Sequence, residues 1–349
     1  MSATEKHNLS FVTQNDLRIA RVSTELNSLD RLGHCKARWG IGRMKYTVAP
    51  GIYAIGTPDG DSPVFVSANY KMSFDRLRSS LHGRNGWILV LDTKGINVWC
   101  AAGKGTFGTD ELVSRIEAVG LSGIVNHRSL IVPQLGAPGV SAHNVKQRSG
   151  FKVIYGPVLA KDLPAFLDAG LKATDRMRQI CFTLPDRTVL IPIEMVMAAK
   201  PAIITAVCFF ILAGLNPRGY STSLTVTDGL PSAALLLTGF LAAAILGPIL
   251  LPWLPGRAFS LKGLWIGLAM SLLLAARSYT HPEFLTSRLN TIAWMVITPI
   301  VTSFVLMNFT GASTYTSLSG VRREIKIAVR WQVSCAIVGI GLWLTARFI

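Results

Sequence analysis

The fold is decided by residues 87–104, which read WILVLDTKGINVWCAAGK. The first six of them, Trp87 to Asp92, form a short apolar run that lies between Gly86 and Gly95. Such a run, bounded by glycines, is typical of a strand that is buried on both faces of a mostly parallel sheet. We therefore expect the carboxyl end of this strand to face whatever ligand the fold holds.

Residues 97–104 predict a helix of barely two turns. Asn97 is a favourable N-cap, because its side-chain oxygen can accept a hydrogen bond from a free amide two or three residues later. Gly103 and Gly105 provide a C-terminal stop. Cys100 then lies in the first turn, where unpaired amides and the helix dipole favour an anionic sulfur, and Lys104 follows one turn later. This arrangement suits a large flat ligand that carries a soft metal.

Three other interpretations of residues 97–105 can be compared with the sequence. A phosphate-binding loop would need Gly at position 98 and Ser or Thr at position 105, where the chain has Val98 and Gly105, so a Walker motif is excluded. A structural role stays open, because a lone Cys beside Trp and Ala is often a small buried hydrophobe. A catalytic nucleophile fits less well, since no spacing ties His127 or His143 to Cys100.

Residues 92–105, DTKGINVWCAAGKG, resemble the cap-helix signature of the HgcA family, the membrane-bound corrinoid proteins of mercury methylation. The match is uninterrupted across the motif. It continues through residues 63–77, 127–145 and 149–164 into the hydrophobic carboxyl-terminal half, while the stretch to about Leu32 carries no part of it. The resemblance implies a corrinoid-binding domain related to that of the corrinoid iron-sulfur protein of the acetyl-CoA pathway.

The resemblance also implies a site. The Cys100 thiolate would be the catalytic residue and the lower axial ligand of cobalt, and as a strong soft donor it would favour transfer of methyl from Co(III)-methyl to Hg(II), which forms methylmercury. Val98, Trp99 and Ala101 would supply a dry wall beneath the ring. The residues expected to bind the cobalamin-type corrinoid are Asn97, Val98, Trp99, Cys100, Ala101, Ala102, Gly103, Lys104, Ser67, Asn69, Thr93, Gly136 and Gly139.

A corrinoid-dependent methyltransferase of this kind needs partners. Re-methylation of cobalt requires an electron donor of low potential, and the chain has no Cys run of the iron–sulfur type. The family implies the ferredoxin-like protein HgcB as donor and a folate-linked methyltransferase as methyl source. The alternative is a membrane-anchored corrinoid carrier or sensor that passes methyl to another protein or metal centre. For mercury delivery, Cys35 and Cys181 are candidates, whereas Cys208 and Cys335 fit small buried hydrophobes.

The character of the chain changes near Pro192. Residues 1–192 contain 24 Lys and Arg against 15 Asp and Glu, and the remainder contains 11 against 4. We expect residues 1–190 to form the corrinoid-binding domain, with the cap helix at 97–104, and residues 191–349 to form a transmembrane domain. Its five apolar segments are each long enough to cross roughly 30 Å of hydrocarbon. They lie at about residues 195–215, 232–254, 259–276, 291–309 and 329–348.

The charge pattern predicts location and excludes other classes. Lys and Arg are more frequent after the second and fourth spans than after the first and third, so the positive-inside rule places the amino-terminal domain in the cytoplasm. The expected location is the cytoplasmic (inner) membrane, in contact with membrane lipid, as a multi-pass protein. No nucleic-acid binding is expected, because no basic cluster is interleaved with aromatic residues. The five Cys are an odd number without regular spacing, which argues against a disulfide framework and fits a reducing compartment.

Strand and helix patterns alternate through the amino-terminal half. Strands are predicted at residues 63–67, 87–92, 130–132 and 151–155, and the helix after the first of them is expected to be capped by Ser73. Residues 1–30 are predicted to be irregular, and residues 46–48 and 51–55 to be short strands or extended loops. His34-Cys35 is a weak candidate for a soft metal. The fold class is therefore α/β, a doubly wound Rossmann-like domain, followed by an all-α transmembrane domain of five helices.

Overall fold

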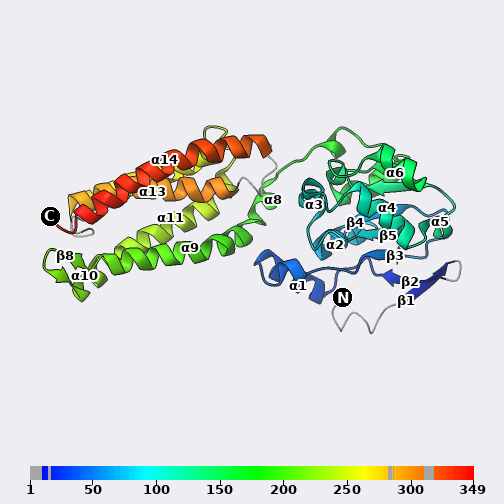
Figure 1. Cartoon of the computed structure of the whole chain (residues 1–349), viewed down its shortest axis with the longest axis horizontal. Coiled ribbons are helices and arrows are strands. Elements are labelled where there is room, and N and C mark those ends of the chain that lie inside the picture. Colours follow the sequence, from blue (N-terminus) through cyan, green and yellow to red (C-terminus); the bar gives the residue numbers. More distant parts are fainter. Residues whose placement is uncertain (1–9, 15–16, 282–284, 286, 310–317) are drawn as a thin grey trace. The chain divides into compact units, whose positions relative to one another are not determined.

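The computed structural model describes residues 10–14, 17–281, 285, 287–309 and 318–349. It divides into two compact units, unit 1 from Met1 to Ile180 and unit 2 from Cys181 to Ile349. Unit 1 is α/β, and unit 2 is helical apart from one very short hairpin (Figure 1). The predicted fold class, an α/β domain followed by five long apolar helices, is confirmed.

Within the described residues, unit 1 is built on a seven-stranded mixed sheet in the order β1-β2-β3-β5-β4-β6-β7. Strands β5, β4, β6 and β7 are parallel, and β3 runs antiparallel to β5. The carboxyl ends of the four parallel strands therefore meet at one edge. The bounds are β1 Ser10–Gln14, β2 Leu17–Val22, β3 Gly51–Ile55, β4 Val64–Ala68, β5 Gly86–Leu91, β6 Ser129–Val132 and β7 Lys152–Tyr155.

Helices cover both faces of this sheet. Successive side chains of β5 point to opposite faces, so this strand contributes to the buried core on each side. Trp87, Leu89 and Leu91 pack into one buried cluster with residues of α3, α4, α5 and α6. Ile88 and Val90 pack into the other, with residues of α2 and α7. The bounds are α1 Ser28–Arg38, α2 Lys71–Ser80, α3 Val98–Lys104, α4 Thr109–Ala118, α5 Leu121–Ile124, α6 Ala142–Ser149 and α7 Leu163–Asp168, with 3-10 turns η2 Arg43–Lys45, η3 Gln134–Gly136, η4 Ala160–Asp162 and η5 Arg176–Arg178.

The amino-terminal segment differs from the sequence expectation. Strands β1 and β2 form an antiparallel pair where an irregular stretch is predicted, and β2 also pairs in parallel with β3. Part of that prediction, residues 1–9 and 15–16, lies outside the described residues. Of the two expected short strands, residues 51–55 form β3, whereas residues 46–48 make a single bridge, between Thr47 and Tyr70. Whether such a segment becomes a strand depends on its pairing with neighbouring strands, which the local sequence pattern does not indicate.

Helix α2 begins earlier than predicted, because a buried set of charges holds its first turn. Its N-cap is Tyr70 and not Ser73. The Lys71 ammonium lies 3.0 Å from Asp75 Oδ1, one turn later, and 2.7 Å from Asp30 Oδ1 on α1. We call the set Asp30, His34, Lys71, Asp75 and Arg78 the α1–α2 ion cluster.

The remaining contacts of the α1–α2 ion cluster lie within α2 or join it to α1. Arg78 Nε donates to Asp75 Oδ1 at 2.6 Å and Arg78 Nη2 to Asp30 Oδ2 at 2.7 Å. His34 Nε2 lies 2.8 Å from Asp75 Oδ2. Burial alone would raise the pKa of Asp75, but the hydrogen bond with His34 and the charges of Lys71 and Arg78 outweigh it and lower that pKa. The cluster thus holds both carboxyl groups ionised.

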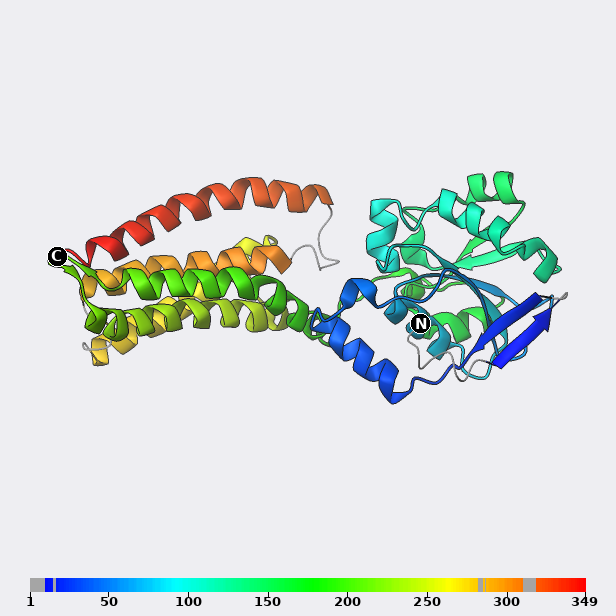
Figure 2. The ribbon, with the colours of Figure 1, turned by 60° about the horizontal axis from the view of Figure 1, so that its bottom comes forward.

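Unit 2 contains five helices, among its described residues, that are long and apolar enough to cross a membrane. Helices α11 and α13 lie at the centre of the packing, while α9 packs on α11 and α14 on α13; Figures 1 and 2 show these helices running side by side. The bounds are α8 Leu184–Thr188, α9 Ile191–Leu212, α10 Thr222–Thr227, α11 Gly229–Leu250, α12 Phe259–Thr280, α13 Arg288–Asn308 and α14 Leu318–Thr345, with the short hairpin β8 Leu215–Asn216 and β9 Gly219–Tyr220.

Small residues let α12 and α13 approach closely. A Cβ built on Gly263 would lie 2.4 Å from the carbonyl oxygen of Thr302, and one built on Gly267 would lie 2.3 Å from Cα of Pro299. These two glycines therefore place one helix backbone directly against the other, which is a common mode of packing in membrane helices.

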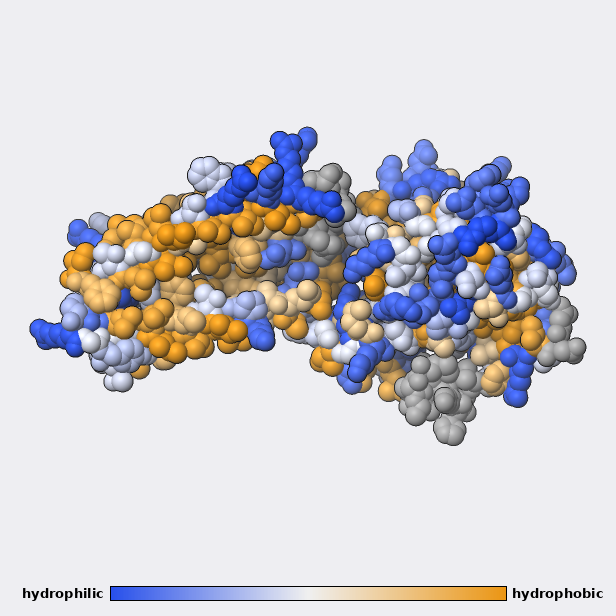
Figure 3. Space-filling view, in the orientation of Figure 1, coloured by the Kyte–Doolittle hydropathy of each residue, from blue (hydrophilic) through white to orange (hydrophobic). Residues whose placement is uncertain are grey.

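The cysteines of unit 2 correct one expectation. Cys208 on α9 and Cys335 on α14 are exposed, whereas the sequence favours small buried hydrophobes. The reason is that α9 and α14 are the outer helices of the bundle, where most side chains face outward. Figure 3 shows the outer surface of these helices as largely apolar, as expected for side chains that face lipid.

Candidate functional site

Helix α3 begins and ends much as its sequence predicts. Asn97 is the N-cap, and its Oδ1 accepts a hydrogen bond from the amide of Cys100 at 2.9 Å. Gly105 is the C-cap, with φ of 82°, and its amide donates back to carbonyl groups of α3. This left-handed conformation favours glycine. Gly103, expected to share in the stop, lies inside the helix instead.

Cys100 lies on the open face of α3. Its side chain is exposed, as are Gly103 and Lys104. These positions at i, i+3 and i+4 share one face of a helix. The side chains of Ala101 and Ala102 are buried in the core of unit 1, so they anchor α3 to the sheet. A role for Cys100 as a small buried hydrophobe is therefore wrong.

Val98 and Trp99, in the first turn of α3, are both half-buried. Val98 packs against the buried cluster that contains Ala101 and Ala102. Ala101, expected to form a wall with Val98 and Trp99, is fully enclosed by protein and supports the helix from beneath. The contact of Val98 and Trp99 with a ligand stays a prediction.

Asn69, at the carboxyl end of β4, organises the loop between β5 and α3. Its Oδ1 accepts hydrogen bonds from the amides of Thr93 at 3.2 Å and Gly95 at 3.0 Å, and it lies 2.8 Å from Thr93 Oγ1. Thr93 Oγ1 also donates to the carbonyl oxygen of Ile96 at 2.6 Å. Asn69 and Thr93 therefore hold this loop, whereas Ser67 is buried and donates only to the neighbouring carbonyl of Ala68. Direct contact of these three with a cofactor stays a prediction.

Two residues of the same loop adopt left-handed backbone conformations. Lys94 has φ of 57° and Gly95 has φ of 72°. The turn is held by Asp92, whose Oδ1 accepts from the Lys94 amide at 3.1 Å and whose Oδ2 lies 2.5 Å from Lys94 Nζ. That hydrogen bond from Lys94 lowers the pKa of the Asp92 carboxyl. A Cβ on Gly95 would lie 2.7 Å from the carbonyl oxygen of Met44, so the loop contacts η2 closely.

Glu111 is a positioning residue that the sequence analysis did not identify. Its Oε1 accepts a hydrogen bond from the backbone amide of Asp92 at 2.8 Å, and Arg115 Nη2 donates to the same oxygen at 2.7 Å. The i, i+4 spacing of Glu111 and Arg115 on α4 is a signal for that ion pair. Nothing in the sequence indicates the bond to the strand end.

Gly136 and Gly139, in the loop after β6, are closely packed by other parts of the chain, so a larger residue would clash at either position. A Cβ on Gly136 would lie 2.4 Å from the Phe107 ring. One on Gly139 would lie 2.1 Å from the carbonyl oxygen of Phe107 and 3.1 Å from Cα of Ala102. This loop therefore supports the carboxyl end of α3. That either glycine also approaches a corrin ring stays a prediction.

The His34-Cys35 pair does not form a joint site in the structure. His34 turns toward Asp75 in the α1–α2 ion cluster, whereas Cys35 is exposed, and adjacent residues of a helix point about 100° apart. Cys181 is exposed as well. Among the described residues, no group of three or more His, Cys, Asp or Glu side chains is placed to hold a metal ion.

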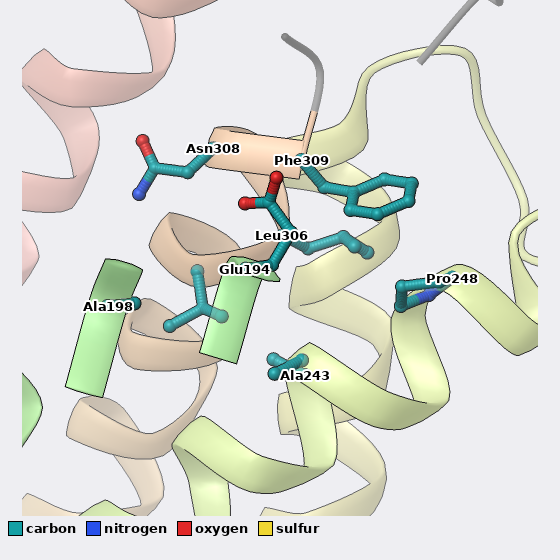
Figure 4. Close-up of a pocket in the computed structure, with 9 residues that line it drawn as sticks. Glu194, Ala198, Ala243, Pro248, Leu306, Asn308 and Phe309 are labelled. Atoms are coloured by element: carbon teal, nitrogen blue, oxygen red, sulfur yellow. The ribbon is translucent and has the colours of Figure 1, made fainter. Parts of the chain in front are cut away.

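Unit 2 contains a small cavity. It measures about 20 Å³, which holds about one water molecule and is far too small for a tetrapyrrole ring. Figure 4 shows the Glu194 carboxylate extending toward the end of α13. The lining residues are Glu194, Ala198, Ala243, Ala244, Pro248, Val305, Leu306, Asn308 and Phe309.

Comparisons with known proteins point to the same part of the chain. Residues 19–167, from β2 to α7, match the family described as CO dehydrogenase/acetyl-CoA synthase delta subunit (CdhD). Acetyl-CoA decarbonylase/synthase complex subunit gamma of Archaeoglobus fulgidus is 33% identical over 128 residues, and that of Methanopyrus kandleri is 32% identical over 128 residues. In both cases the alignment covers 36% of this chain and 27% of the relative. The matched region lies within unit 1 and includes α3 with Cys100.

Proposed function

We propose that the chain is a corrinoid-dependent methyltransferase that forms methylmercury, with the Cys100 thiolate as the lower axial ligand of cobalt. The observation that carries this proposal is the position of Cys100: an exposed sulfur on a two-turn helix, directly after the carboxyl end of a central parallel strand. Open α/β sheets bind ligands at that edge. A soft thiolate is a suitable donor for a transition metal held in a ring.

Gly103 supports the presence of a ligand on the open face of α3. Glycine inside a helix is about 1 kcal/mol less favourable than alanine, so a helical glycine calls for a physical reason. A Cβ built on Gly103 would meet no atom of the chain within 4 Å. No positive φ requires glycine there either. A flat ring that lies against the helix beside Cys100 would supply the reason.

The chain's own residues have defined tasks in this proposal. When bound, the corrinoid supplies a cobalt-held methyl group, and Hg(II) is the substrate that receives it. Cys100 donates its sulfur to the metal, and Asn97 fixes the turn from which that sulfur projects. Asn69 holds the loop that leads into α3. Half-buried Val98 and Trp99 would form part of the wall beneath the bound ring.

The partners and the location are part of the same proposal. The relatives are named as subunits of a complex, which supports a need for protein partners. We propose HgcB, a ferredoxin-like iron–sulfur protein, as electron donor and a folate-linked methyltransferase as methyl source. The five long apolar helices support a place in a membrane. We propose the cytoplasmic membrane, with unit 1 in the cytoplasm, from the distribution of Lys and Arg between the spans.

A second candidate is a membrane-anchored corrinoid carrier that delivers methyl to another protein. The names of the relatives favour it, because they describe parts of a multi-subunit complex. A direct assay separates the two functions. The full chain is purified in detergent, loaded with a methylated corrinoid and mixed with Hg(II) alone. Methylmercury at a rate above that of the free methylated corrinoid supports the methyltransferase, whereas release of methyl only after a second protein is added supports the carrier.

Gly103→Ala tests whether a ligand lies on α3. The added methyl group should raise the free energy of unfolding of the corrinoid-free chain by about 0.5–1 kcal/mol, because it removes the cost of a helical glycine. The same methyl group should weaken retention of the corrinoid, measured by visible absorption after gel filtration. Gly123→Ala is the control, since its Cβ also meets no atom within 4 Å but lies on α5. If Gly103→Ala retained the corrinoid as well as the wild type does, Gly103 would no longer support a ligand on the open face of α3.

A further inference from the structure

Helix α1 turns an acidic residue inward and leaves two leucines on its outward side. Asp30 and Ala37 are buried, and Asp30 joins the α1–α2 ion cluster. Leu29 and Leu32, by contrast, are 59% and 50% exposed. A helix on a soluble domain usually does the opposite and buries its apolar stripe. The outward face of α1 therefore lacks the partner that its composition calls for.

The apolar stripe continues past the end of α1. Trp39, the C-cap, follows Leu32 by seven residues on the same side of the helix and is 45% exposed. Ile41 and Met44, at and before η2, are 63% and 62% exposed. We call Leu29, Leu32, Trp39, Ile41 and Met44 the α1 patch. Such a group of large exposed apolar residues within one short segment is typical of an interaction surface.

Within residues 28–45, the exposed charges are of one sign. Arg31, Lys36 and Lys45 are exposed, and Asp30, the one acidic residue in the sequence between 28 and 45, is neutralised within the ion cluster. Figure 3 shows hydrophilic and apolar surface next to each other over α1. Apolar side chains with Trp among them, flanked by Lys and Arg, are the composition of a segment that lies in the interface of an anionic membrane.

From these observations we propose that the α1 patch docks unit 1 onto an anionic lipid surface. Two features favour lipid over a protein. The flanking charges are uniformly basic, and the same chain carries five helices that can cross a bilayer, so a membrane surface is always within reach of unit 1. The patch is continuous with the candidate site, because the Met44 carbonyl contacts Gly95 in the loop that leads to α3. Docking would thus hold one side of that loop at the membrane.

A photocrosslinker in the full chain tests this proposal. Leu32→p-benzoylphenylalanine places the reactive group in the patch, and Leu17→p-benzoylphenylalanine places it on β2, where Leu17 is similarly exposed at 46%. Each protein is reconstituted in nanodiscs of phosphatidylcholine with or without phosphatidylglycerol, irradiated and analysed by mass spectrometry. We expect lipid adducts at position 32 to exceed those at position 17 by at least about fivefold, and to fall when phosphatidylglycerol is omitted.

Charge variants provide the second arm. Removal of Lys36 and Lys45, as Lys36→Gln with Lys45→Gln, should lower the lipid adduct at position 32 by roughly 25-fold, since each surface Lys contributes about fivefold. Lys146→Gln with Lys152→Gln removes two exposed charges elsewhere in unit 1 and should leave the adduct unchanged. Equal adducts at positions 17 and 32, no response to phosphatidylglycerol, or crosslinks from position 32 to residues 181–349 or to a second copy would each overturn the proposal.

Discussion

Cys100→Ala should reduce methylmercury formation by the corrinoid-loaded chain by at least about a hundredfold, because loss of a direct metal ligand costs more than the 10- to 100-fold of a supporting residue. Cys100→His should retain a small part of the rate, since imidazole can ligate a metal but donates less than a thiolate. The measurement is methylmercury formed per bound corrinoid with Hg(II) in excess. The visible spectrum of each loaded variant reports the axial ligand independently of activity.

The control for this prediction is Cys208→Ala, which removes an exposed sulfur on α9, outside the candidate site. Truncation of an exposed side chain changes stability little, so Cys100→Ala should fold normally. Its thermal unfolding should match that of the wild type. Wild-type rates of methylmercury formation from Cys100→Ala would refute the assignment of Cys100 as the cobalt ligand. That result would not bear on the docking of the α1 patch.

Asp75→Ala should lower the free energy of unfolding of unit 1 by about 3–5 kcal/mol, because removal of one partner leaves buried charges without compensation. Asp75 is fully buried and contacts Lys71, Arg78 and His34. After its removal, Asp30 alone faces the two buried cations. Urea unfolding of the full chain in detergent measures the change, with Trp fluorescence as the probe, since Trp87 is fully buried in unit 1.

Asp168→Ala is the matched control, because its ion pair with Arg84 is on the surface, with the carboxyl side chain 64% exposed. That variant should change stability by less than about 1 kcal/mol. The pH dependence supplies a second check. The pKa values of Asp30 and Asp75 lie below their usual value of 3.8 in the folded chain, so their stabilisation is complete above that pH and is lost as the pH falls through the folded values. Asp75→Ala should lose less stability in that range, and an unchanged acid profile would contradict the account.

The sequence predicted α3 well, because its signals are local. Asn97 and Gly105 act within a few residues, through a side-chain cap and a left-handed turn. The strand β5 was equally clear, since its unbroken apolar run is buried on both faces. The five apolar helices follow from length and composition, with ends shifted by several residues.

What the sequence did not predict depends on contacts between distant residues. Asn69 reaches from β4 to three groups of the loop after β5, more than twenty residues later. The early start of α2 depends on Asp30 of α1, and β2 exists as a strand because β1 and β3 flank it. The close packing of Phe107 on Gly136 was likewise not predicted, because the two residues lie 29 positions apart in the sequence. Local sequence patterns indicate where a helix begins and ends. They do not indicate which distant side chain forms a hydrogen bond or an ion pair with it.

The close approach of α12 and α13 has a practical consequence. Gly263 and Gly267 bring the backbone of one helix against Thr302 and Pro299 of the other, so shape fit and dispersion attraction hold this pair. Neither force depends on the expulsion of water or on a particular acyl chain. We therefore expect this hairpin to survive the exchange of bilayer for detergent, which gives the solubilised protein a rigid centre during purification.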